Sequence, residues 1–387
     1  MIPMQNARRH PRFAARLAVI VLATVATAAH QPHAATSQFP ARPAALSFSG
    51  LVDADFVSEF GDDFGTLRHI TGLKLDLATT VTFSPTVAAV IQTTMNDGAV
   101  PAQGAGNTWA TVRFDGVTLN WKYGDHTVIH IGDLRPGTGY FNYYRNKHTA
   151  VVVGEHALRG VGISRSGWTV ATGATGLGAT DTAGNPVASS QWSTFARYDY
   201  RIAAGVTLTP SLRYTAGVPG ATPVVGGLSF DGAFGAFSLS LDLAGNYYSS
   251  STDPGFTVLI EPAYAGSRFS LSSSFYFNEQ GSGIPAPNHP VQTRTGVDLD
   301  RAYAYVEPGI AITDLVTLGL ALEYHDAHDA TAAALGYDES VWVVPALYLH
   351  PGAGAQWRIW GQATKPLSGT GSMDPLFFAG SEVVFRF

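Results

Sequence analysis

The segment Thr317–Tyr324, with the sequence TLGLALEY, places Leu318, Leu320 and Leu322 at every second position, between small or polar residues. Successive side chains of a β-strand point to opposite faces, so this segment predicts a strand with one apolar face and one polar or small face. The same alternation occurs in many further segments, from about residue 44 to the last residue. The sequence therefore predicts an all-β chain.

Two architectures could produce this pattern. In a soluble sandwich the apolar face is the core, whereas in a membrane barrel it meets lipid and the polar face lines the lumen. Many segments reach about 10–14 residues, the length that crosses a bilayer at a tilt, while strands of soluble proteins usually have about 5–6. Aromatic pairs such as Trp121 with Tyr123 and Phe385 with Phe387 stand near segment ends, as in interfacial girdles. These features favour a transmembrane antiparallel β-barrel.

The connections between segments also alternate in length. Short turns are expected at 84–86, 203–205 and 313–314, whereas longer polar connections such as 279–300 and 327–338 lie between them. Outer-membrane barrels have short periplasmic turns and longer external loops. Counting up and down predicts about eighteen strands, or sixteen if one or two pairs merge. The weakest point is 226–249, where Asp231-Gly232-Ala233 is expected to form a tight turn or a bulge.

The composition agrees with a lipid-facing β-structure. Charged residues make up 13% of the chain, against about 25% in typical globular proteins, while aromatic residues reach 11% and there are 42 glycines. After the first thirty residues no apolar run approaches the ~18 residues that a spanning helix needs. Cysteine is absent, which excludes disulfides, iron–sulfur clusters and cysteine-based zinc sites.

The N-terminus resembles a secretory signal peptide. Arginines precede an apolar run over 17–29 that is too short to span a membrane, and Ala26-Thr27-Ala28 offers a cleavage site, with a later cut near Ala35 as an alternative. We therefore expect residues 1–35 to be the signal peptide and 36–387 to form one barrel. Removal of residues 1–35 takes away four arginines and no acid, so the net charge falls from −6 to −10. An acidic mature chain argues against nucleic acid as a partner.

The last segment, LFFAGSEVVFRF over 376–387, resembles the closing strand of Gram-negative outer-membrane barrels, because it ends on an aromatic residue with further apolar residues two, four and ten positions back. In that family the terminal Phe387 implies recognition by the barrel-assembly machinery, and the bacterial outer membrane is the implied location. The segment 121–134 is similar to a porin hairpin that runs into an inward-folded loop, and Arg159-Gly160-Val161-Gly162 is similar to the strand that follows such a loop. Porins imply a channel and, commonly, a homotrimer.

A barrel of sixteen to eighteen strands encloses an aqueous channel, so a segment that narrows it is expected. The connection 134–156 is the candidate, with an ordinary external loop as the alternative. Aromatic faces there offer stacking for a sugar ring, and cationic side chains would attract anions. The predicted pore constriction comprises Arg135, Tyr140, Tyr143, Tyr144, Arg145 and Lys147 from this connection and Arg113 from the wall.

By alternation, nine cations and nine carboxylates face the lumen, which leaves selectivity undecided; most are interpreted as cross-strand ion pairs. The expected cations are Lys74, Arg113, Lys122, Arg197, Arg201, Arg213, Arg268, Arg358 and Arg386. The expected carboxylates are Asp53, Asp55, Asp76, Asp199, Asp242, Glu261, Glu307, Glu323 and Glu382. The basic connection tips the balance toward a weak preference for anions.

Enzymatic interpretations are weaker. Ser164 lies in Gly162-Ile163-Ser164-Arg165-Ser166, which lacks the second glycine of a nucleophile elbow, and 325–329 offers His and Asp without a visible supporting shell. No catalytic residue, metal or cofactor is predicted. We expect a porin-like channel for passive diffusion of small hydrophilic solutes or ions, weakly anion-preferring or sugar-accepting. The rival is a barrel that acts as a rim enzyme or a surface binding scaffold, which ten or twelve strands around a packed lumen would favour.

Overall fold

The structure is a computed structural model in which every described element is a strand, and no described segment forms a helix that could cross a membrane. It describes residues 45–60, 66–96, 111–134, 158–175, 191–216, 224–247, 256–279, 300–327, 339–352, 354–368 and 374–387. The predicted signal peptide, the connection 134–156 beyond Leu134 and most of the other long connections lie outside these residues.

The strands follow one another along the whole described chain. They are β1 Ala45–Phe60, β2 Thr66–Ser84, β3 Val87–Asn96, β4 Thr111–Tyr123, β5 Thr127–Leu134, β6 Leu158–Arg165, β7 Trp168–Thr175, β8 Trp192–Tyr198, β9 Tyr200–Ala203, β10 Val206–Ala216, β11 Val224–Phe234, β12 Phe237–Tyr247, β13 Phe256–Ala265, β14 Phe269–Glu279, β15 Asp300–Thr313, β16 Val316–Ala327, β17 Glu339–Gly352, β18 Ala355–Ser368 and β19 Leu376–Arg386.

Two of these segments form one strand of the wall. β8 and β9 are separated only by Asp199, and both pair antiparallel with β10. The wall therefore has eighteen strands, as predicted.

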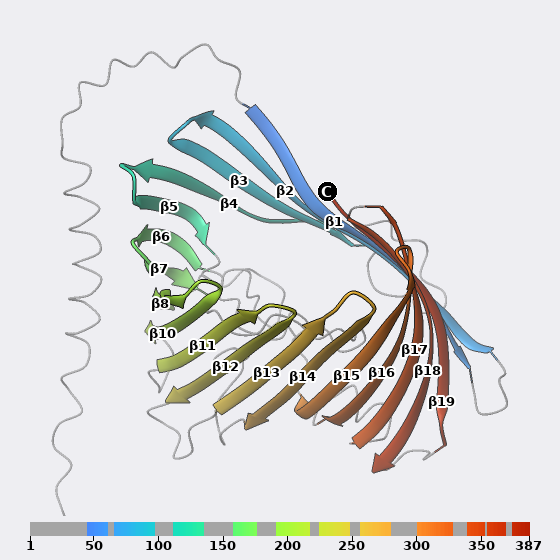
Figure 1. Ribbon diagram of the computed structural model, residues 1–387. Helices are drawn as coiled ribbons and strands as arrows, with labels where there is room; N and C mark the ends of the chain where they lie inside the picture. The colour runs from blue at the N-terminus through green and yellow to red at the C-terminus, as the bar shows by residue number, and fades with distance from the viewer. Residues whose placement is uncertain are drawn as a thin grey trace, which may run out of the picture.

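The sheet closes on itself without a free edge. Each strand pairs antiparallel with its sequence neighbours, and β1 pairs with both β2 and the C-terminal strand β19. In Figure 1 the blue first strand meets the red last strand at one side of the barrel. Closure satisfies every edge, which a sheet in lipid requires. The predicted closing role of the last strand is confirmed.

The short turns all join hairpins at one end of the barrel, for example at Pro85–Thr86, Ala204–Gly205 and Asp314–Leu315. One prediction was wrong. Asp231-Gly232-Ala233 is neither a turn nor a bulge, because β11 runs to Phe234 and keeps its register with β12 throughout. The turn comes at Gly235–Ala236, where Gly235 has a φ of 67° that glycine adopts without steric cost.

The two faces of the wall differ as the alternation predicts. On β16, Leu318, Leu320 and Leu322 are 42–48% exposed, whereas the intervening Ala321 and Glu323 are at most 4% exposed. Large exposed apolar side chains of this kind occur on strands around the wall. A continuous exposed apolar face is not stable in water and matches the lipid-facing band of a membrane barrel.

Aromatic residues mark the edge of this band at the short-turn end. Trp121 and Tyr123 pack edge to face with centroids 5.8 Å apart, and Phe385 and Phe387 stack at 5.9 Å. Similar pairs flank other short turns, such as Phe234 with Phe237 at 6.4 Å. Such rings suit the lipid–water interface, so the expected girdle is present at this end.

Candidate functional site in the barrel lumen

The inward face of β12–β19, together with Leu51 of β1, surrounds a cavity of about 550 Å³. It is predominantly polar, and its charged side chains are Glu261, Glu307, Glu323, Glu382, Arg358 and Arg386. Alternation predicted that all six would face the lumen, and the structure brings them together along one wall. Four carboxylates against two arginines make this wall acidic. We name it the acidic wall.

Glu307 is held by two tyrosines of the acidic wall. The hydroxyls of Tyr305, on the same strand, and Tyr348, on β17, each donate a hydrogen bond to its carboxylate. Charge-assisted hydrogen bonds of this kind are stronger than neutral ones. These two bonds fix the carboxylate in place, and Glu307 is only 6% exposed.

Arg358 is fixed by aromatic rings and a carboxylate. Its guanidinium carbon lies 5.6 Å from the ring centroid of Tyr348 and 5.8 Å from that of Trp360. Its Nη1 atom lies 3.9 Å from Oε2 of Glu382. Cation–π contacts strengthen when the cation is partly desolvated, so this arginine presents a rigid positive charge inside the acidic wall.

The other two carboxylates also accept hydrogen bonds from neighbouring strands. Ser274 Oγ donates to Glu261 Oε1 over 2.6 Å, and Tyr303 OH donates to Glu323 Oε2 over 3.4 Å. These bonds link β13 to β14 and β15 to β16 on the lumen side. The acidic wall is therefore cross-braced by hydrogen bonds, and Arg358 with Glu382 is the expected kind of cross-strand ion pair.

Further arginines lie across the lumen from Arg358 and Glu382, because β8–β10 stand about nine strands from β18–β19 in this eighteen-strand wall. The register places Arg197, Arg201 and Arg213 on the inward face of these strands. Arg197 Nη2 lies 3.5 Å from Asp199 Oδ2. The other carboxylate oxygen of Asp199, Oδ1, accepts a hydrogen bond from Thr209 Oγ1 over 3.2 Å. We name these three arginines the basic wall.

Sequence alternation gave the inward face of the charged residues around this cavity, but it was wrong for Arg268, which lies exposed in the turn between β13 and β14, and it missed one inward cluster. His130 on β5 lies between Asn120 and Ser164, with Nδ1 2.7 Å from Asn120 Oδ1 and Nε2 3.0 Å from Ser164 Oγ. An amide oxygen can only accept, so in the neutral ring Nδ1 donates and Nε2 accepts from the serine. The alternation of polar residues on β4 to β6 could have placed these three side chains on the same face. It does not reveal the cross-strand register, which brings them into contact.

This geometry has the nucleophile, base and orienting group of a serine hydrolase. Ser164 nevertheless sits within a regular ladder, paired with Val128 and Thr169 on its two sides. The ladder engages the backbone amides that would have to form an oxyanion hole, which is usually the largest catalytic contribution. The cluster is therefore better explained as a hydrogen-bonded brace between β4, β5 and β6.

The contacts described above do not test the predicted constriction. Arg135, Tyr140, Tyr143, Tyr144, Arg145 and Lys147 all lie outside the described residues. The backbone of Arg113 lies in β4 opposite Thr94, on the lumen-facing register, and its side chain is outside the description. His328 and Asp329 of the 325–329 segment are likewise not described.

The fold is that of porin-type outer-membrane β-barrels. No protein family and no curated protein matches the sequence. Among solved structures, OccK2 (OpdF) of Pseudomonas aeruginosa is 12% identical with a TM-score of 0.54, over 88% of this chain and 97% of that one.

Two further solved structures are similar to this chain in fold. A BenF-like porin from Pseudomonas fluorescens Pf-5 is 10% identical with a TM-score of 0.54, covering 88% of this chain and 98% of that one. Pseudomonas aeruginosa OpdK, solved with vanillate, is 11% identical with a TM-score of 0.50, covering 88% and 98%. Together with the exposed apolar band, these likenesses confirm the predicted outer-membrane barrel fold.

Proposed function

We propose that this chain forms a porin-like channel for the passive diffusion of small hydrophilic solutes and ions across the bacterial outer membrane. The observation that carries the proposal is the closed wall of eighteen strands with charged and polar side chains on its inward face. Barrels of sixteen to eighteen strands are too wide for wall side chains to fill and enclose water. The terminal Phe387 supports recognition by the barrel-assembly machinery, and a homotrimer is the expected assembly.

The finer proposal is a weak preference for anions. The acidic wall has an excess of carboxylates and the basic wall an excess of arginines, so the described side chains alone do not favour one sign. The basic residues Arg135, Arg145 and Lys147 of the connection 134–156 would add positive charge if that connection folds into the lumen. Charged rings set selectivity when they stand at the narrowest point.

Aromatic side chains in the lumen support uptake of ring-shaped solutes. Tyr305 and Tyr348 line the same cavity as Arg358, and Tyr140, Tyr143 and Tyr144 would contribute further rings from the connection. A sugar or an aromatic carboxylate could stack on such faces while its polar groups bond to the wall. Because OpdK was solved with vanillate, vanillate is a reasonable first solute.

Swelling of liposomes that contain the purified barrel tests this proposal. Neutral sugars of increasing size should enter at rates that fall with size, and vanillate should enter faster than a neutral ring of similar size. Protein-free liposomes are the control. Equal swelling with and without protein, for the smallest sugar, would contradict diffusion through the barrel.

One observation favours the rival enzyme, namely the arrangement of Ser164, His130 and Asn120. A fluorophosphonate probe attacks activated serines, and a Ser164→Ala variant identifies the labelled position. We expect no label on Ser164, because the oxyanion donors are engaged in the ladder. Labelling of the natural protein that disappears in Ser164→Ala would favour the hydrolase instead. The eighteen strands also differ from the ten or twelve that this rival would favour.

A further inference from the structure

Two opposite charges stand on the outer face of the barrel. Asp133 of β5 and Arg159 of β6 are paired positions of the ladder, and Arg159 Nε lies 2.6 Å from Asp133 Oδ1. Alternation places both opposite to the inward His130 and Ser164 and on the same side as Ile131, which is 42% exposed. The Arg159 side chain is 63% exposed. An ion pair therefore interrupts the apolar outer face.

The ion pair lies well inside the apolar band. Trp121, in the aromatic girdle at the short-turn end, pairs with Ile129, and Asp133 comes four residues later on β5. Four residues span about 14 Å at about 3.4 Å per residue, or about 10 Å in depth at a tilt of about 40°. The apolar band is about 25 Å tall, so Asp133 stands near its middle. On β4 the outward Phe114, 60% exposed, lies farther from the girdle than Val117, which bonds to Asp133. The apolar face therefore continues beyond the ion pair.

The carboxylate is built into the wall. The β3–β4 ladder shifts its register after Gln92, and the backbone amide of Val117 donates to Asp133 Oδ2 over 3.1 Å. Gly116 has a φ of 138°, and an added side chain there would collide with Asp133. One carboxylate oxygen is thus held by the bulge and the other by Arg159. The pair has a fixed place on the outer face.

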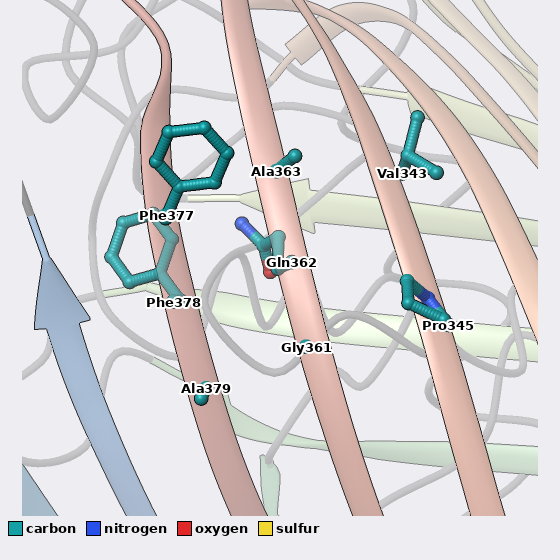
Figure 2. Close-up of a pocket in the computed structure, with 8 residues that line it drawn as sticks. All are labelled: Val343, Pro345, Gly361, Gln362, Ala363, Phe377, Phe378 and Ala379. Carbon is teal, nitrogen blue, oxygen red and sulfur yellow. The ribbon is translucent and has the colours of Figure 1, made fainter. Parts of the chain in front are cut away.

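Lipid does not suit this part of the outer face. Hydrocarbon offers no polar partner, and an arginine at this depth is costly there. On other strands the outer face is mainly apolar, as in the groove across β17–β19 that Figure 2 shows, with Val343, Ala363 and Phe377 in its lining. β5, β6 and β7 are also only eight residues long, which corresponds to about 21 Å of depth at the same rise and tilt. These strands therefore fall short of the full height of the apolar band.

We propose that the outer face of β5–β7 is the contact between copies of this barrel in the membrane, with the Asp133–Arg159 pair at its centre. Copies share one orientation, so their ion pairs stand at the same depth. Asp133 lies on one side of the face and Arg159 on the other. When copies are arranged around an axis along the membrane normal, the aspartate of each copy meets the arginine of the next. The face is therefore self-complementary in charge, and it fits the expected homotrimer as well as a dimer.

Cross-linking between single cysteines in outer membranes tests the proposal, because the chain has no cysteine of its own. Ile131→Cys places a thiol beside the ion pair. Leu320→Cys is the matched control, since both side chains are 42% exposed and each follows the first residue of its strand by four positions. A short bis-maleimide should link Ile131→Cys into multiples of the chain mass and leave Leu320→Cys monomeric. Equal yields at the two positions, including none at either, or linkage of Ile131→Cys to a protein of another mass would overturn the proposal.

Native mass spectrometry of the detergent-purified barrel tests the charges. Arg159→Asp should abolish the oligomer, because the copies would then bring only carboxylates together at one depth, whereas Arg159→Lys should keep it. Arg165→Asp changes an exposed arginine at the short-turn end of the same strand and is the control. Circular dichroism verifies that each variant is folded. A monomeric natural protein, or an oligomer that persists in Arg159→Asp, would overturn the proposal. Each copy encloses its own lumen, so both experiments measure association whether or not the barrel conducts.

Discussion

Arg358 and Glu382 occupy paired positions on β18 and β19, with Nη1 of the arginine 3.9 Å from Oε2 of the glutamate. Both side chains are mostly buried, at 18% and 10% exposure. The arginine is also held by the rings of Tyr348 and Trp360. Removing either partner therefore leaves a fixed charge of the other sign at a defined place in the lumen.

Opposite shifts in ion selectivity should follow from the two single changes. Glu382→Gln should move the reversal potential in a salt gradient toward anions, and Arg358→Gln should move it toward cations, because each removes one charge from the wall. Gln356→Ala, a neutral change at the same cavity, is the control and should move neither. An unchanged reversal potential in both charge variants would mean that ions do not pass this wall.

The alternation of β16 gives a prediction about stability. Leu320→Arg should lower the free energy of unfolding by about 2–4 kcal/mol if Leu320 lies near the midplane, because it places a charge in lipid. Thr317→Arg places the same side chain on the lumen face and should be tolerated. Denaturant unfolding in lipid bilayers measures both. Equal losses at the two positions would show that the register or the lipid-facing assignment is wrong.

The sequence alone predicted the number of strands and which side chains of a strand such as β16 face lipid or the lumen, because alternation and turn residues are local signals. It misplaced the turn near Asp231, since Asp-Gly is a common turn pair. In the structure Asp231 accepts a hydrogen bond from Ser240 Oγ over 2.7 Å and belongs to the ladder. The contacts of Arg358 with Tyr348 and Glu382 depend on the register of three strands, which alternation alone does not fix.

A further prediction concerns the connection 134–156, which beyond Leu134 lies outside the described residues. If it narrows the lumen, Arg145→Glu together with Lys147→Glu should move selectivity toward cations at low salt. The shift should shrink at 1 M salt, where the Debye length falls to about 3 Å. An Arg145→Lys variant, which keeps the charge, is the control. No shift at low salt would place the connection outside the pore and direct the search to the wall arginines.

The predicted signal peptide can be tested by mass spectrometry of the protein extracted from the outer membrane. Because a basic segment and a short apolar run precede Ala26-Thr27-Ala28, the mature chain should begin between residues 29 and 36. A mutation of the small residues at the cleavage site should slow processing. An outer-membrane protein that retains residues 1–28 would contradict this assignment.

Single-channel recording in planar lipid bilayers tests the central claim most directly. A closed wall of eighteen strands around a charged, polar lumen should give discrete current steps whose size rises with salt concentration. Such steps should be absent when only detergent is added, and the Glu382→Gln and Arg358→Gln variants should alter their reversal potential. Folded protein that inserts into the bilayer without current steps would contradict the assignment of this barrel as a diffusion channel.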